Sequence, residues 1–113
     1  MIESVEPKPA DSTIVQGAEL LKAMAHPLRL AILVALLEEP KCVHELVESS
    51  GATQPLVSQH LRVLRSAELL RREQRGREAV YSIIDDHIHH IVVDAVDHVR
   101  SEGTRHDPHV HNA

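Results

Sequence analysis

Aromatic residues are almost absent from this chain, whose 113 residues include no Trp, no Phe and only Tyr81. Any core must therefore be built from Leu, Ile, Val and Ala, a composition typical of a mostly helical protein. The single Cys42 excludes an internal disulfide and a site made of several thiolates from one chain. No run approaches the roughly 18 apolar residues that span a bilayer, and the first residues are acidic and contain proline. We therefore expect one small cytoplasmic domain with no signal peptide and no membrane partner.

The motifs of common enzyme classes are also missing. The sequence contains no HExxH pair, no nucleophile elbow and no Gly-rich phosphate loop. We therefore expect a protein that is not an enzyme and has no small-molecule substrate.

A basic excess is lacking as well, since the net charge of −5 argues at first against a nucleic-acid partner. The charge is unevenly distributed, however. Residues 54–80 hold six Arg against three Glu, a local charge of +3 that leaves −8 for the remainder. Because nucleic-acid binding needs only a local basic surface, this segment is a candidate DNA interface.

Helical periodicity dominates the first part of the chain. Apolar residues recur at helical spacing over about 15–25, which predicts a first helix. The very apolar segment 27–39 predicts a central core helix, in which Pro27 suits the first turn and which Pro40 ends.

Two further helices are predicted in close succession. The first covers about 43–49 and should stop at Gly51, whereas Thr53 should cap the second, which tolerates Pro55 in its first turn. Helix, tight turn and helix is the pattern of a helix-turn-helix.

The second of these helices has two distinct faces. Val57, Leu61 and Leu64 share an apolar face that should pack, with His60 directed toward it. Another face carries amide, hydroxyl and guanidinium groups, which read base edges and phosphates, although a merely solvated face is the alternative. That face consists of Gln54, Ser58, Arg62 and Arg65.

A basic turn follows this helix. Two β-type runs flank Arg75, Gly76 and Arg77, which predicts a hairpin. A hairpin directly after a recognition helix is the wing of a winged helix-turn-helix, and arginines at its tip would meet backbone phosphate or the minor groove. A surface hairpin with ordinary solubilising charge is the alternative.

A last helix, predicted over about 86–102, combines an apolar stripe with metal-type ligands at both ends. The stripe is a natural dimer seam and consists of Ile88, Ile91, Val92, Ala95 and Val99. Asp85 and His87 lie at the start of the helix, and His98 and Glu102 lie at its end.

One ion cannot contact both ends of this helix. His87 and His98 lie on nearly the same face but roughly 16 Å apart at a rise of about 1.5 Å per residue. A second copy laid antiparallel would bring the start of one helix to the end of the other. Two equivalent sites would then straddle a dimer axis.

The ends of the chain lack apolar periodicity. Residues 1–13 are predicted to form a flexible arm, and residues 104–113 a flexible tail that contains His106, His109 and His111. For residues 14–103 between them we expect a dimeric domain that binds DNA and senses metal.

These segments together resemble the ArsR/SmtB family of metal-responsive winged-helix repressors. The resemblance covers about residues 18–102 and rests on LLKAMAHPLRLAILVALL, CVHELVESSGATQPLVSQHLRVLRSAELL and RGREAVYSI. The segment DDHIHHIVVDAVDHVRSE is similar to the last helix of the zinc-sensing SmtB branch, whose pattern is Asp-x-His, ten residues, then His-x-x-Glu or His-x-x-His. Asp85, His87 and His98 fall on that pattern, whereas Ser101 occupies the fourth position and Glu102 lies one residue later.

The resemblance implies a mainly α fold with a small β-hairpin, a winged helix-turn-helix that dimerises through its first and last helices. It further implies a transcriptional repressor of palindromic operator DNA. Zn²⁺ held by Asp85 and His87 of one subunit and by His98 and Glu102 of the other would release that DNA. The expected DNA contacts are Gln54, Ser58, Gln59, Arg62, Arg65, Arg75 and Arg77.

Several alternatives stay open at this point. His90, Asp94 and His98 are spaced so that adjacent members could hold an ion within one helix, whereas His89 should face solvent. A nickel or cobalt sensor would favour six ligands, which His106, His109 and His111 could complete. A protein that buffers zinc without touching DNA is the alternative from another class.

A second metal site occurs in some family members, where a Cys of the helix-turn-helix pairs with ligands from the N-terminal arm. Cys42 and Glu45 occupy the matching positions, and His44 lies beside them. Residues 1–16, however, contain no Cys or His. We therefore expect Cys42 to be structural or at most a weak ligand.

Overall fold

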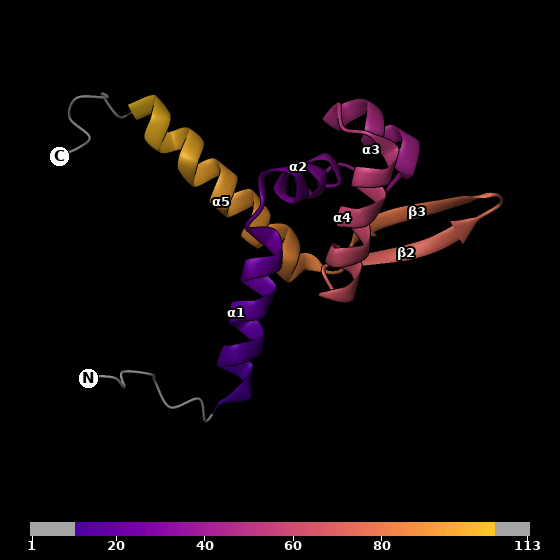
Figure 1. Cartoon of the computed structure of the whole chain (residues 1–113). Helices are drawn as coiled ribbons and strands as arrows, with labels where there is room; N and C mark the ends of the chain where they lie inside the picture. The colour runs from indigo at the N-terminus through magenta and orange to yellow at the C-terminus, as the bar shows by residue number, and fades with distance from the viewer. Residues whose placement is uncertain (1–10, 106–113) are drawn as a thin grey trace.

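The computed structural model describes the backbone of residues 11–105 and the side chains of residues 11–101. Its elements follow in the order α1 (Ser12–Met24), α2 (Pro27–Ala35), β1 (Lys41–Cys42), α3 (Val43–Ser50), α4 (Gln54–Ser66), β2 (Leu70–Arg75), β3 (Glu78–Ile83) and α5 (Asp86–Arg105). Helices α2, α3 and α4 pack together, the β2–β3 hairpin extends to one side, and α1 and α5 extend away from it (Figure 1). The predicted fold, mainly helical with a small hairpin, is confirmed.

Helix α1 begins slightly earlier than the sequence predicted. The carboxylate of Asp11 caps it, because Oδ1 accepts a hydrogen bond from the Thr13 backbone N–H at 2.9 Å. Ser12 and Thr13 therefore belong to the helix rather than to the predicted arm. Residues 1–10 lie outside the described part of the chain.

Helix α2 begins at Pro27 as predicted but ends at Ala35, so the prediction of a helix over 27–39 was too long. The last turn tightens, since the Leu36 N–H is shared between Ile32 O and Leu33 O, both at 3.1 Å, and Leu37 donates to Val34 O. The helix has ended well before Pro40, which therefore does not terminate it.

The helix-turn-helix formed by α3 and α4 has the predicted stop and cap. Gly51 has a φ of 77°, the left-handed conformation that closes a helix, and its N–H donates to Val47 O. Thr53 Oγ1 accepts from the Leu56 N–H at 3.4 Å, with Pro55 in the first turn of α4.

The hairpin is part of a three-stranded antiparallel sheet in the order β1-β3-β2. Gly76 forms the turn of the hairpin with a φ of 64°. Strand β1 was not predicted, because two residues are too few to show alternation. It pairs Cys42 with Val80 and so ties the start of α3 to the wing.

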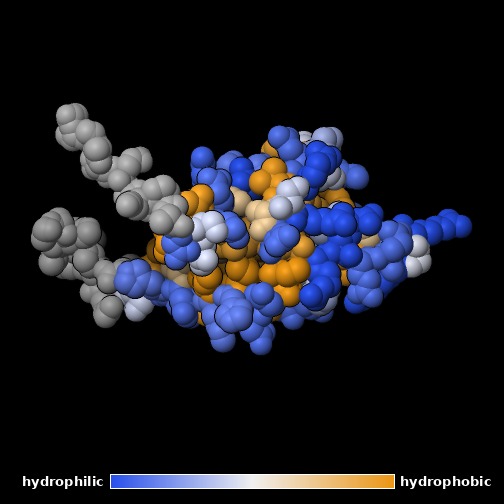
Figure 2. Space-filling model, turned by 90° about the horizontal axis from the view of Figure 1, so that it is seen from below, coloured by the Kyte–Doolittle hydropathy of each residue, from blue (hydrophilic) through white to orange (hydrophobic). Residues whose placement is uncertain are grey.

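The core is aliphatic, as the composition predicted. Side chains from α2, α3, α4, α5 and the segment between α4 and β2 meet in it, and those with almost no exposed surface are Ile32, Leu33, Leu46, Val57, Leu61, Leu64, Leu69 and Val92. Several large apolar side chains of α1 and α5 remain exposed, namely Ile14, Val15, Leu21, Ile91 and Val99. Hydrophobic residues spread over the middle of the face in Figure 2, whereas hydrophilic ones follow the wing.

None of the helices within residues 11–105 is both long enough and apolar enough to cross a bilayer.

The end of α4 contains one strained residue, Glu68, whose φ is 62°. Its N–H donates to Arg65 O and the Leu69 N–H donates to Leu64 O, both at 2.9 Å, which is the Schellman pattern at a position that favours glycine. We expect Glu68→Gly to raise the free energy of unfolding by about 0.5–1 kcal/mol in a urea titration. Glu73→Gly, at an exposed position within β2, should instead lower it by a similar amount. Equal effects of the two substitutions would contradict this account.

Candidate DNA interface and metal centre

The face of α4 that the sequence assigned to DNA is accessible. Burial of Val57, Leu61 and Leu64 fixes the rotation of the helix. Gln54, Gln59, Arg62 and Arg65 are then exposed and Ser58 is half-buried. A shallow groove of about 340 Å³ runs along this face between α4 and the wing, and is lined by Ser58, Leu61, Arg62, Arg65, Ser66 and Tyr81. The geometry leaves a polar, basic helix face free for a duplex.

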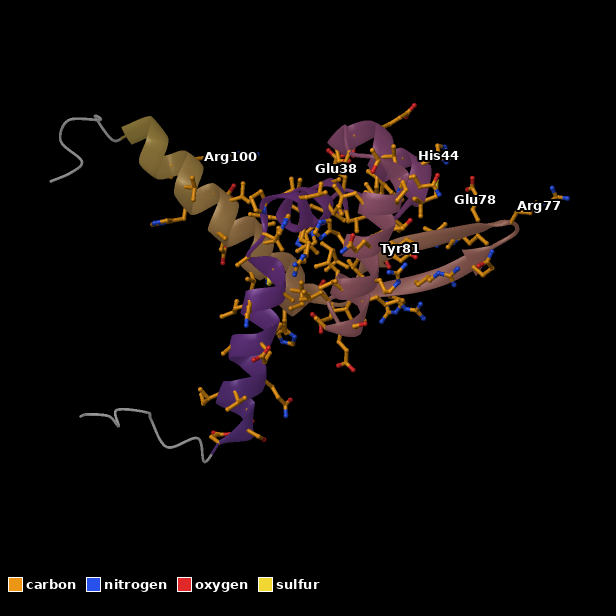
Figure 3. The ribbon with its side chains drawn as sticks, in the orientation of Figure 1. Glu38, His44, Arg77, Glu78, Tyr81 and Arg100 are labelled. Atoms are coloured by element: carbon orange, nitrogen blue, oxygen red, sulfur yellow. The ribbon has the colours of Figure 1, made fainter. Side chains whose placement is uncertain are left out.

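The two predicted arginines of the wing, Arg75 and Arg77, differ in their surroundings. Arg77 lies at the tip and its side chain extends away from the strands (Figure 3). The Arg75 guanidinium instead forms an exposed ion pair with Glu73 at 3.1 Å. Arg75 would have to exchange this carboxylate for a phosphate, so Arg77 is the more available of the two.

The inner face of α4 is held by a polar contact as well as by packing. His60 is buried, as predicted, and its Nδ1 accepts a hydrogen bond from Arg29 Nε at 3.2 Å. Arg29 also donates to the carbonyl of Ala23 at 2.9 Å, and the ring of His26 lies 4.5 Å from that of His60. Arg29 of α2 therefore links α1 to the recognition helix.

Acidification should weaken this link. Burial lowers the pKa of His60 below 6.5, and His26 and Arg29 lower it further. The unfolded chain then binds more protons near that pH, so His60 makes stability fall as pH drops through about 6.5. His60→Gln keeps a hydrogen-bond acceptor but does not titrate. We expect its melting temperature to fall less between about pH 7.5 and about pH 5.5 than that of the parent protein. Identical losses would contradict the role given to His60.

The start of α5 carries a preformed pair of metal-type ligands. Asp85 caps the helix, because its Oδ1 accepts from the Ile88 N–H at 3.0 Å. Its other oxygen, Oδ2, lies 3.9 Å from Nδ1 of His87, whose side chain is 92% exposed. The cap orients the Asp85 carboxylate, so that Oδ2 lies beside the exposed His87 ring at the start of α5.

The predicted ligand His98 lies far from this pair within one chain. α5 is continuous from Asp86 to Arg105, which places His98 about 16 Å along the axis from His87. His90, Asp94 and His98 are all exposed. Among the described side chains these three do not form a group with converging ligand atoms. The Glu102 side chain and the residues His106, His109 and His111 lie outside the described part.

His89 differs from expectation. It is half-buried, and its Nε2 lies 3.3 Å from the carbonyl oxygen of Leu37. The prediction that it faces solvent was wrong, because the segment just after α2 passes beside α5 at this point.

A second cluster of ligand-type groups is present where the sequence suggested an incomplete site. Among the described side chains, one group of three brings its ligand atoms within 4.8 Å of one another, and it consists of Cys42, His44 and Glu78. Glu45 does not take part, because its Oε1 accepts from the Cys42 N–H at 2.9 Å and so caps α3. That hydrogen bond lowers the pKa of Glu45. Glu78 was missed because only the unpredicted strand β1 brings Cys42 to the wing.

Comparison with known proteins identifies the family of this chain. Residues 26–72 match the sequence model of a protein family described as "Bacterial regulatory protein, arsR family". Over 93 residues the chain is 48% identical to the HTH-type transcriptional repressor SmtB of Mycobacterium tuberculosis, a match that covers 81% of this chain and 69% of that protein. It is 41% identical over 91 residues to the HTH-type transcriptional regulator NmtR of the same organism, covering 80% and 76%.

Solved structures give the same fold. The transcriptional repressor PagR of Bacillus anthracis is 35% identical and superposes with a TM-score of 0.67 over 72% of this chain and 93% of that one. A homodimeric winged helix-turn-helix DNA-binding domain from Mycobacterium bovis, Mb0332, is 23% identical with a TM-score of 0.77 over 92% and 95%.

The expectation of a transcriptional regulator rather than an enzyme is confirmed, because the matching family and the relatives are DNA-binding regulators. The winged helix-turn-helix predicted from the helices and the basic hairpin is likewise confirmed by the fold. This chain is a transcriptional repressor of the ArsR/SmtB family.

Proposed function

We propose that this protein is a homodimeric, zinc-responsive repressor that binds palindromic operator DNA and releases it when Zn²⁺ occupies sites between two α5 helices. The observation that carries the proposal is the oriented Asp85–His87 pair, which leaves an open half-site at one end of α5 while His98 lies exposed at the other. As a regulator of transcription, it would act in the cytoplasm.

The exposed apolar side chains support the dimer. Ile14 of α1 is 69% exposed and Val99 of α5 is 67% exposed, which is costly for a protein that stays monomeric. Pairing two copies through α1 and α5 would cover them. The Mycobacterium bovis domain with the same fold is described as homodimeric.

The donor set fits zinc. In an antiparallel pair, Asp85 and His87 of one subunit would meet His98 and Glu102 of the partner subunit, which gives nitrogen and oxygen ligands for a tetrahedral ion. Asp85 would bind through Oδ2, since Oδ1 is held by the cap. Bound zinc would supply a rigid link between the two helices. The two-fold axis of the dimer would give two equivalent zinc sites.

The fold offers a route from this seam to DNA. Helix α2 packs against both α5 and α4, so a change in the angle between two α5 helices would be passed to the recognition helices through α2. Two recognition helices must keep the spacing of the operator half-sites to bind together. A coupling of about 1–3 kcal/mol corresponds to roughly 5- to 150-fold in affinity. The resemblance to zinc-sensing repressors supplies the direction, in which metal weakens DNA binding.

The DNA contacts proposed for each subunit come from α4 and the wing. Gln54, Ser58, Gln59 and Arg62 would contact base edges and phosphates in the major groove. Arg65, Arg75 and Arg77 would contact the backbone.

Ser101 favours one second candidate, a nickel or cobalt sensor of the same family. It occupies the fourth ligand position and is a poor metal ligand, so His106, His109 and His111 would complete a six-coordinate site. The visible spectrum of the cobalt-substituted protein separates four-coordinate from six-coordinate geometry. Zinc buffering without DNA binding is disfavoured, because the chain belongs to a family of DNA-binding repressors.

The direct test is the fluorescence anisotropy of labelled DNA from upstream of the protein's own gene, titrated with the protein with and without Zn²⁺. We expect tight binding by the metal-free protein and an affinity lowered about 5- to 150-fold by zinc. Binding that zinc does not change would remove the sensor proposal, and release by Ni²⁺ alone would support the second candidate.

A further inference from the structure

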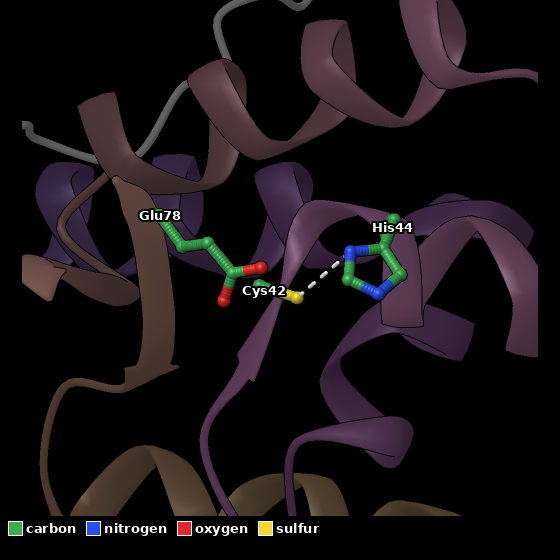
Figure 4. Close-up of side chains that lie close together, drawn as sticks. All are labelled: Cys42, His44 and Glu78. Atoms are coloured by element: carbon green, nitrogen blue, oxygen red, sulfur yellow. Dashed lines mark hydrogen bonds between the residues drawn. The ribbon is translucent and has the colours of Figure 1, made fainter. Parts of the chain in front are cut away.

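The start of α3 and the wing share a cluster of three ligand-type side chains that the proposed function does not use. Cys42 ends β1, His44 lies in the first turn of α3, and Glu78 begins β3 (Figure 4). Cys42 Sγ lies 3.2 Å from His44 Nδ1, and a Glu78 carboxylate oxygen completes the group within 4.8 Å. Cys42 is 6% exposed, whereas His44 and Glu78 are exposed. The cluster therefore has one buried ligand and two ligands that solvent reaches.

The backbone, rather than chance contact of long side chains, brings these groups together. Cys42 pairs with Val80 across the β1–β3 ladder, and Glu78 lies two residues from Val80 on the same face of the strand. Glu45, the other carboxylate nearby, already caps α3. The structure thus provides three converging ligands, of which the wing supplies one.

We propose that Cys42, His44 and Glu78 form a second metal site for a thiophilic divalent ion, Zn²⁺ or Cd²⁺, with water as the fourth ligand. One thiolate, one imidazole and one carboxylate suit these ions and fit a four-coordinate site. On binding, the Cys42 thiol loses its proton to solvent, the sulfur gains a metal bond, and its contact with His44 is replaced by coordination of both groups. This site takes its carboxylate from the wing and needs no ligand from residues 1–16.

The cluster lies between the start of the recognition helix and the tip of the wing. A shallow cavity of about 220 Å³ is lined by the three ligands together with Val43, Gln54, Arg77 and Ala79. Gln54 opens the recognition helix and Arg77 lies at the wing tip. A bound ion would therefore join the wing to the helix-turn-helix beside the DNA-facing surface, separately from the α5 seam.

The thiolate makes this site measurable apart from the α5 site, whose proposed ligands include no sulfur. The full-length, reduced His87→Ala/His98→Ala protein is titrated with Cd²⁺, and the ultraviolet sulfur-to-metal charge-transfer band is recorded. We expect a band that saturates at one ion per chain and that Cys42→Ser abolishes. His44→Ala and Glu78→Gln, both at exposed positions, should weaken Cd²⁺ affinity by about tenfold or more. Glu73→Gln, a matched glutamate on β2 of the same wing, should leave it unchanged.

Two results would overturn the proposal: no charge-transfer band, or a band whose Cd²⁺ dependence is the same in the Glu78→Gln and His44→Ala proteins as in their parent. Circular dichroism of each variant separates loss of ligand from loss of fold. Because the titration is made without His87 and His98, its failure leaves the proposed function untouched, and failure of zinc-induced DNA release leaves this site untouched.

Discussion

Replacing His98 by Ala is expected to abolish zinc-induced release of operator DNA while leaving the affinity of the metal-free protein within about twofold. His98 is exposed on α5 and far from the α4 face, so the substitution removes a proposed ligand without disturbing the DNA interface or the core. The parent protein should lose about 5- to 150-fold in affinity with zinc, whereas His98→Ala should lose almost nothing. Anisotropy titrations with and without Zn²⁺ give both numbers.

His90→Ala is the matched control, because His90 is also an exposed histidine of the same helix. It should respond to zinc like the parent protein. A variant at position 90 that also loses the response would favour the alternative site formed by His90, Asp94 and His98. Loss of metal-free DNA binding in His98→Ala would mean that His98 is structural.

Replacing Arg62 by Ala is expected to weaken operator binding by about 1–3 kcal/mol, which is roughly 5- to 150-fold. Arg62 is exposed and lines the groove between α4 and the wing. A contact to a base should also relax specificity at one position of the operator. A contact to phosphate should instead weaken all sequences alike and reduce the salt dependence of binding.

Lys22→Ala controls for net charge in this experiment. Lys22 is exposed on α1, outside the groove, so its loss changes the charge equally without removing a proposed contact. We expect less than about a twofold change in operator affinity. Equal losses for Lys22→Ala and Arg62→Ala would show that α4 contributes only general positive charge.

Local signals in the sequence accounted for the helix-turn-helix and the wing. Gly51 and Thr53 mark the turn chemically, and the apolar spacing of Val57, Leu61 and Leu64 fixed which face of α4 is free. Gly76 between two arginines similarly marked the hairpin. Such features are decided within a few residues, so they can be inferred from sequence alone.

Features that depend on tertiary contacts were missed. Strand β1 is too short for a pattern, and without it nothing places Glu78 beside Cys42. The contact of His89 with the carbonyl of Leu37 depends on how α2 ends, and α2 ended before Pro40 because its last turn tightened. These contacts link residues far apart in the chain, which periodicity does not report.

The central claim is that each α5 site is shared between two subunits, and mixed dimers test it most directly. His87→Ala and His98→Ala proteins, each also carrying Cys42→Ser so that the Cys42 cluster does not bind zinc, are titrated with Zn²⁺ against a chromophoric chelator, separately and after unfolding and refolding together. Neither alone should form the tight site. A mixed dimer, however, joins the intact Asp85 and His87 of one subunit to the intact His98 of the other, so refolding together should restore one tight site per mixed dimer. No tight site after refolding together, despite mixed dimers shown by native mass spectrometry, would contradict the account.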